Sequence, residues 1–255
     1  MNPVLQFGDA SGEQSSHVLT APEVLELLGK YQLIPPLLKE VVIDQAIAQI
    51  ECTPQEEQLA CEQFAQQYQG RKEQNISSEQ LNKMAIRQLK LEKFKEATWG
   101  EDLDSYFFQR KSQLDRVIYS LITTSEIGIA QEIYFRIQEG EQSFGQLARE
   151  YAQGTEAQTD GLVGPVELQS LHPRLIQIFS VSQPQQLSPP NQIGEWIVIV
   201  RLEKLLPAQL DRPMHQRLLN ERFQSWLQAQ IAPQNWQIKQ SDVLVVRTMK
   251  HNKIL

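Results

Sequence analysis

The sequence contains few residues of the kinds that most often bind metals or form disulfides. Only four of its 255 residues are histidine and two are cysteine. The histidines are dispersed along the chain without metal-ligand spacing, so no metal is expected. Cys52 and Cys61 would face opposite sides of one helix, too far apart for a disulfide. Two free thiols are typical of a reducing cytoplasm.

Long apolar runs and an excess of positive charge are also absent. No run of about eighteen apolar residues occurs, so no membrane-spanning helix is predicted. The first residues, MNPVLQFGDASGEQ, have neither the basic nor the apolar region of a secretory signal, and we expect a cytoplasmic protein. The net charge is −7 with lysine and arginine scattered, so binding to nucleic acid is not expected.

Helical patterns dominate the first part of the chain. Residues 1–17 are polar, with Gly8, Gly12 and a pair of serines, and are expected to form a flexible arm. Residues 18–114 are predicted to form a helical domain, because apolar residues recur at helical spacing over 19–31, 35–50, 54–68, 77–95 and 103–114. Thr53, Pro54 and Glu56 form a helix-start signal of N-cap, first-turn proline and capping-box glutamate.

Residues 115–207 show a different pattern. The apolar run over 117–122 predicts a buried strand, and Trp196–Val200 predicts a central strand covered on both faces. Between them, 127–140 and 143–152 have helical periodicity, and Ser143 with Gln146 has the form of a capping box. Two glycine turns, a short helix over 173–179 and the closing strand complete one small α/β module.

Residues 208–255 are predicted to return to the helical domain. A helix over 211–231 carries Phe223 and Trp226, and a helix of this length with two large aromatic residues needs a partner surface. The N-terminal helices are the natural partner, which makes the module an insertion. Residues 236–246 are predicted to form a strand or hairpin. The predicted fold class is α+β: a helical domain completed by a C-terminal helix, plus the module.

The sequence motifs of residues 115–207 resemble those of the parvulin (PpiC-type, rotamase) family of peptidyl-prolyl isomerases. The matching phrases are GEQSF with LAREY over 140–151, GLVG over 161–164, His172-Pro173 with Leu175 and Phe179, and IGEW over 193–196. The resemblance implies a module with a mainly antiparallel sheet. The order of the flanking helices resembles the SurA and PrsA group, in which such helices form one chaperone domain.

The chemistry that this resemblance implies needs no cofactor. Rotation about an X–Pro bond faces a barrier of about 18–20 kcal/mol. A site must hold the proline ring and favour the twisted amide over the planar one. Parvulins perform both tasks with an apolar pocket, a histidine pair on neighbouring strands and a polar residue. The resemblance places Leu171, Leu175 and Phe179 at the pocket, with the alternative that these three are plain core. It places Leu162 at the polar position.

The histidine pair is missing from this chain. Ser120 or Leu121 stands at the first histidine position and Trp196 at the second. Tyr119, Ser120 and Trp196 could instead form a hydrogen-bonded floor beneath the pocket, since all three can donate hydrogen bonds. Asp160, beside Gly161, could replace the missing polar group. The alternative is that these four residues are ordinary packing and turn residues.

Two functions from different classes follow. The first is a peptidyl-prolyl isomerase, or foldase, that acts on proline-containing polypeptides with activity reduced by the missing histidines. The alternative is a non-catalytic chaperone or adaptor that binds unfolded polypeptide or peptides awaiting export. A purely structural module is disfavoured because the pocket positions keep their apolar bulk. The partner is an unfolded or proline-containing polypeptide in either case, while the client and the oligomeric state stay open.

Overall fold

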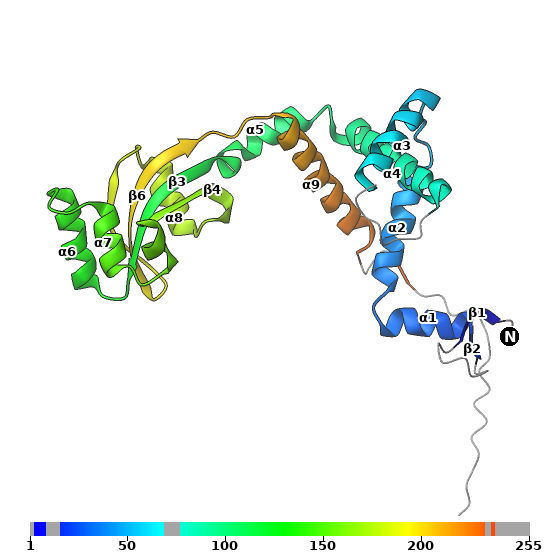
Figure 1. Ribbon diagram of the computed structural model, residues 1–255, viewed down its shortest axis with the longest axis horizontal. Helices are drawn as coiled ribbons and strands as arrows, with labels where there is room; N and C mark the ends of the chain where they lie inside the picture. Colours follow the sequence, from blue (N-terminus) through cyan, green and yellow to red (C-terminus); the bar gives the residue numbers. More distant parts are fainter. Residues whose placement is uncertain (1–2, 9–15, 69–76, 233–235, 238–255) are drawn as a thin grey trace, which may run out of the picture. The chain divides into compact units, whose positions relative to one another are not determined.

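A computed structural model describes residues 3–8, 16–68, 77–232 and 236–237. The chain divides into two compact units, one of Met1–Glu101 with Leu219–Leu255 and the other of Asp102–Leu218 (Figure 1). Helices and antiparallel sheets occur together, and the predicted α+β class is confirmed. Within the described residues, no helix combines the length and the apolar character needed to cross a membrane.

The first unit is mostly helical. Its helices begin and end close to the predicted positions: α1 Ala21–Lys30, α2 Ile34–Ile47, α3 Pro54–Tyr68, α4 Ser78–Trp99 and the end of α9 Arg212–Gln230. The predicted capping box at the start of α3 is present, because the Thr53 amide donates to Glu56 Oε2 at 2.8 Å and the Glu56 amide donates to Thr53 Oγ1 at 3.3 Å.

Aromatic rings join α4 to α9 within this unit. The Phe94 ring centroid lies 5.4 Å from that of Trp226, and the Trp99 ring lies 6.3 Å from that of Phe223. Lys95 is almost fully buried beside them and donates to Asn220 Oδ1 at 2.6 Å. Residues that precede the second unit therefore share a core with residues that follow it.

The start of the chain differs from the expected flexible arm. Strand β1 Pro3–Gly8 pairs antiparallel with strand β2 Ser16–Thr20. The glycines and serines of this segment indicate a loop, but the flanking PVLQF and SHVLT segments contain the β-branched and aromatic residues that favour strands. The predicted strand or hairpin over 236–246 lies largely outside the described residues.

The second unit contains the predicted module. It comprises α5 Leu103–Leu114, β3 Arg116–Thr124, α6 Ile127–Gln138, α7 Phe144–Tyr151, β4 Leu162–Glu167, α8 Pro173–Val181, β5 Leu187–Ile193, β6 Trp196–Leu206 and the start of α9, with 3-10 turns at Thr155–Thr159 and Leu168–Ser170. The four strands form an antiparallel sheet in the order β4-β3-β6-β5.

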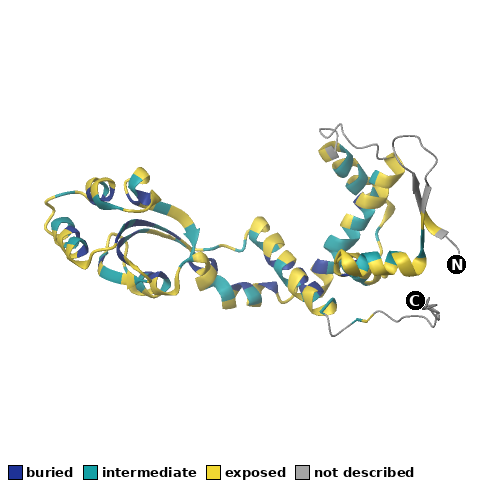
Figure 2. Ribbon diagram, turned by 90° about the horizontal axis from the view of Figure 1, so that it is seen from below, coloured by how far each residue is buried: buried dark blue, intermediate teal, exposed yellow. Residues whose placement is uncertain are grey.

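The two faces of this sheet bury separate apolar clusters. On one face, Ile122, Ile197 and Ile199 pack with residues of α6 and α7. On the other, Val198 and Val200 pack with Leu175 and Phe179 of α8. Alternate residues of β6 thus enter opposite clusters, and the predicted central strand covered on both faces is confirmed. Figure 2 shows buried residues concentrated on the strands of this sheet.

The caps of α7 and α8 agree with the sequence signals. Ser143 and Gln146 form the predicted capping box at the start of α7. His172 precedes α8, where its Nδ1 accepts a hydrogen bond from the Arg174 amide at 3.2 Å. Both caps satisfy backbone N–H groups that a helix start leaves unpaired, and so fix where each helix begins.

Candidate active site

The predicted pocket residues of α8 meet Tyr119 on one face of the sheet. Leu175 and Phe179 lie one turn apart on α8 and are 7% and 6% exposed. The ring of Phe179 lies 4.9 Å from that of Tyr119, at an interplanar angle of 49°. Leu171 is half-buried and packs against the same cluster. The three residues predicted to hold proline thus lie together in one apolar cluster, and whether they bind proline stays a prediction.

Tyr119 is the polar group of this cluster. Its side chain is only 4% exposed, and its hydroxyl makes no hydrogen bond within the described part of the chain. Among the described residues, the fully buried side-chain atoms without a hydrogen-bond partner are Gln142 Oε1 and Glu156 Oε1. The Tyr119 hydroxyl is not one of them, so it keeps contact with solvent. Burial, and then the charge of Glu156, raise the pKa of Tyr119. The phenol therefore stays protonated as a hydrogen-bond donor at neutral pH.

Ser120 does not belong to this surface, and the expectation that it shares a floor with Tyr119 was wrong. Successive residues of a strand point to opposite faces, so Ser120 faces α7 while Tyr119 faces α8. The Ser120 hydroxyl donates to Glu203 Oε1 at 2.5 Å. Of the two residues that could stand at the first histidine position, Leu121 is the one on the Tyr119 face, where it packs against the same cluster.

Trp196 is also separate from Tyr119. It begins β6 and pairs with Ile193, whereas Tyr119 pairs with Leu202, six residues further along β6. At about 3.3 Å per residue, these positions are roughly 20 Å apart along the strand. Trp196 is 45% exposed. The structure thus does not bring Tyr119, Ser120 and Trp196 into one floor, because register and strand length, which the sequence does not state, separate them.

Asp160 and Leu162 lie on either side of Gly161 at the edge of the sheet. Asp160 adopts a left-handed conformation with a φ of 55°, and its Oδ1 accepts a hydrogen bond from Arg149 Nη1 at 2.6 Å. Both partners of this ion pair are exposed, so it contributes at most about 1 kcal/mol. Leu162 is half-exposed and pairs with Ser120. Substrate contacts of Asp160, Leu162 and Trp196 stay predictions.

A polar network that the sequence patterns did not indicate lies on the opposite face. The Glu203 carboxylate accepts hydrogen bonds from Ser120, from Arg201 Nε at 2.8 Å and from Gln185 Nε2 at 2.8 Å. The β3–β6 register shifts beside it, between Ile118 and Tyr119. Burial works to raise the pKa of Glu203, but the three hydrogen bonds outweigh it and lower the pKa below 4.5. Only the fold brings these residues together.

We expect Glu203 to stabilise the module above pH 4.5 and to lose this effect on acidification. A carboxyl whose pKa is lowered by folding contributes stability above its unfolded pKa, and loses it as pH falls through the folded pKa. Glu203→Gln should therefore be less stable than wild type at pH 7, by on the order of 1–2 kcal/mol, and the gap should shrink toward pH 3. Urea unfolding at both pH values measures this.

The exposed Glu195 provides the control for this prediction. Glu195→Gln removes a carboxylate of the same module and should match wild type at both pH values. A Glu203→Gln deficit that stays constant from pH 7 to pH 3 would show that the carboxylate charge does not stabilise the network.

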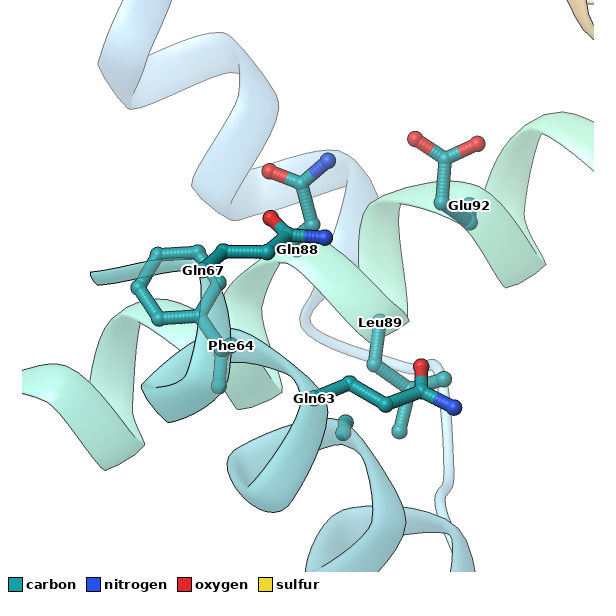
Figure 3. Close-up of a pocket in the computed structure, with 8 residues that line it drawn as sticks. Gln63, Phe64, Gln67, Gln88, Leu89 and Glu92 are labelled. Atoms are coloured by element: carbon teal, nitrogen blue, oxygen red, sulfur yellow. The ribbon is translucent and has the colours of Figure 1, made fainter. Parts of the chain in front are cut away.

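A separate hollow of about 280 Å³ lies in the helical unit between α3 and α4. Figure 3 shows Gln63 and Gln67 of α3 and Gln88 of α4 around it, with Phe64 and Leu89 also lining it. Amide groups can both donate and accept hydrogen bonds. With the carboxylate of Glu92, the lining thus combines amide, charged and apolar groups.

The module can now be compared with known protein families. Residues 123–204 match the family model described as "Rotamase: PPIC-type PPIASE domain". The module is a PPIC-type PPIase domain. The predicted resemblance to this family is therefore confirmed for the module. In this PPIase domain, neither β3 nor β6 contains a histidine.

Several solved structures are similar to the chain that carries this PPIase domain. The peptidylprolyl isomerase PrsA from Bacillus anthracis is 18% identical, with 80% of this chain and 100% of that chain covered and a TM-score of 0.45. PrsA from Bacillus cereus is 16% identical, with 95% of each chain covered and a TM-score of 0.48. A structure of SurA-like chaperones from Campylobacter jejuni is 14% identical, with 88% and 96% covered and a TM-score of 0.36. The comparison with curated proteins found no match.

Proposed function

We propose that this protein is a peptidyl-prolyl cis–trans isomerase, or foldase, that acts on proline-containing polypeptide clients. The observation that carries the proposal is the position of the protonated Tyr119 hydroxyl beside Leu175 and Phe179, on one face of the PPIase domain. The family match supports the reaction class. The missing histidines make Tyr119 the main polar candidate.

The proposed site works by differential binding. The apolar side chains of Leu171, Leu175 and Phe179 hold the proline ring, which is apolar and rigid. As the X–Pro bond twists, the carbonyl loses resonance with nitrogen and turns out of its plane. A donor placed for the turned carbonyl, and not for the planar one, lowers the barrier. Tyr119 donates this hydrogen bond, while the bond itself rotates without proton transfer.

Replacing Tyr119 by phenylalanine tests this role. Tyr119→Phe keeps the ring that packs on Phe179 and removes a hydroxyl that has no hydrogen bond within the described residues. Stability should therefore change little. The rate constant kcat/KM should fall by about 10- to 100-fold, somewhat less than for a preorganised oxyanion donor. Exchange NMR on short alanine–proline peptides measures the rate directly.

The neighbouring Ser120→Ala variant is the matched control. It removes a hydroxyl one position away that faces the opposite side of the sheet, so the isomerisation rate should stay at the wild-type value. An equal loss of rate in both variants would mean that the effect is structural. A folded wild type that does not accelerate exchange would overturn the proposal. Leu175→Ala and Phe179→Ala are weaker tests, because both residues belong to the core.

The second candidate function is a chaperone or adaptor that binds unfolded polypeptide, or peptides awaiting export, without catalysis. Exposed apolar side chains in the helical unit favour it. Of seventeen large apolar side chains exposed among the described residues, eight lie between Val4 and Val41. Suppression of aggregation of a chemically unfolded enzyme, by a wild type that does not accelerate proline exchange, would support this function over the first.

We also propose that the protein works in a reducing compartment such as the cytoplasm. Support comes from Cys52 and Cys61, which are both free and partly exposed. Fractionation of cells that produce the natural protein, followed by immunodetection, tests the location. Recovery in an oxidising compartment would overturn it.

A further inference from the structure

Among the residues that the structure describes, the outer edges of the N-terminal hairpin have no partner strand. Within the described residues, β1 and β2 pair only with each other. A two-stranded hairpin is at best marginally stable and presents unpaired backbone N–H and C=O groups along its outer edges. An extended polypeptide matches the spacing of these groups, and adding a strand is a recurring way of binding peptides.

The edge strands of the two sheets differ in their proline content. In the PPIase domain, the edge strands β4 and β5 contain Pro165 and the pair Pro189 and Pro190. Proline donates no hydrogen bond, and it commonly prevents other strands from adding to an edge. Strand β2, SHVLT, has no proline and no aspartate, glutamate, lysine or arginine. Its sequence therefore lacks the protection that the other sheet has.

Exposed apolar side chains occur on both strands of the hairpin and on the helices that follow it. Val18 of β2 is 46% exposed, and Val4 and Leu5 of β1 are also exposed. Helix α1 follows β2 directly and buries none of its residues, although one side of it is apolar. Leu37 and Val41 of α2 are exposed as well. The neighbouring side chains thus suit a strand with apolar residues.

The charges beside the edge decide between partners. Helix α1 carries Glu23 and Glu26 within its first six residues. Carboxylates at this place disfavour an anionic membrane, which attracts basic segments. A second copy of the chain on the same edge would bring like charges together, which is unfavourable. An extended segment of another polypeptide has neither disadvantage.

We propose that the β2 edge binds an extended, apolar segment of a client polypeptide as an added strand. The exposed apolar side chains of the hairpin and α1 contact the side chains of that segment, while the backbone of β2 pairs with its backbone. This inference rests on the proposed function in one respect, because it takes the ligand to be a client of the foldase. It gives the helical unit a binding site separate from the proline pocket.

A pair of peptides separates strand addition from simple apolar contact. The probe is a fluorescein-labelled peptide of sequence Lys-Val-Thr-Val-Thr-Val-Lys, and its partner carries N-methyl groups on the three valines. The two peptides have the same side chains, but the second cannot donate backbone hydrogen bonds along the edge that carries the three methylated nitrogens. Fluorescence anisotropy with the full chain should give binding of the first peptide and at least tenfold weaker binding of the second.

Variants of the protein locate the site. Val18→Lys places a charge on the edge strand, a natural means of blocking strand addition, and should weaken binding of the unmethylated peptide at least tenfold. Leu59→Lys is the matched control, because Leu59 is an apolar residue of α3 in the same unit and is 57% exposed, against 46% for Val18. It should bind the peptide as wild type does. Circular dichroism confirms that both variants are folded.

Four results would overturn the proposal. They are equal binding of the two peptides, unchanged binding by Val18→Lys, binding that appears only after residues 238–255 are removed, and a dimer that Val18→Lys makes monomeric. The third result would mean that the chain's own end occupies the edge, and the fourth that a second copy does. Exchange on alanine–proline peptides, measured on the same samples, is independent of β2. A wild type that binds the probe without catalysis would thus overturn only the isomerase.

Discussion

Gly161→Ala is expected to destabilise the PPIase domain by about 2–5 kcal/mol. Gly161 has a φ of +81°, a conformation that costs other residues about 1–2 kcal/mol. A Cβ atom at this position would lie 3.0 Å from the carbonyl oxygen of Leu121 and 3.1 Å from the Cβ atom of Ala148. Overpacking of this kind costs a further 1–3 kcal/mol, roughly. Hydrogen exchange should show lost protection in the strands beside Gly161, and urea unfolding gives the free energy.

Gly128→Ala provides the control within the same unit. Gly128 lies in α6 and a Cβ atom there would meet nothing within 4 Å. Alanine is a better helix former than glycine, so this variant should be unchanged or more stable by up to about 1 kcal/mol. Wild-type stability in Gly161→Ala would show that the turn can relax, and that its tight contacts do not hold β3 against α7.

Phe223→Ala is expected to destabilise the helical unit by about 3–5 kcal/mol, the usual cost of removing a buried phenylalanine. Phe223 is 4% exposed, and its ring lies 6.3 Å from that of Trp99 and 5.8 Å from that of Trp226. The truncation leaves a cavity where α9 meets α4. Tryptophan fluorescence during urea unfolding reports the change, because both indoles adjoin the cavity.

Phe108→Ala is the control for this variant, since Phe108 is 70% exposed and its loss should cost less than about 0.5 kcal/mol. If Phe223→Ala were as mild as Phe108→Ala, residues 219–230 would not be part of the core of the helical unit. Isomerisation of short peptides by folded Phe223→Ala should match wild type, because the proposed proline site lies wholly in the other unit.

Much of the secondary structure could be predicted because its signals are local. The capping boxes at Thr53 and Ser143 fixed two helix starts to within a residue. The continuous apolar run at the start of β6 predicted a strand covered on both faces. The hairpin at the chain start was missed because short strands beside glycine and serine have weak local signals. The β-branched and aromatic residues of the two segments favour strands, but the glycines and serines between them indicated a loop.

The candidate site was predictable only in part, because a site depends on which residues share a face. The family resemblance gave Leu175 and Phe179, and Tyr119, predicted to lie beneath them, belongs to the same cluster. Ser120 was grouped with Tyr119 because the two are adjacent in sequence, although adjacency in a strand puts side chains on opposite faces. The Glu203 network was missed because strand pairing brings Ser120 close to Glu203 across 83 positions of sequence.

The division of the helical unit into two segments has a consequence for the order in which the protein folds during synthesis. Trp99 leaves the ribosome well before Phe223 and Trp226, with the whole of the PPIase domain between them. At about 5–20 residues per second, the ring surface of α4 waits roughly 6–25 s for its partners from α9. The PPIase domain is complete when α9 is still being made. The PPIase domain is therefore expected to fold first, while the helical unit stays open to a chaperone, or to misfolding, until α9 has been made.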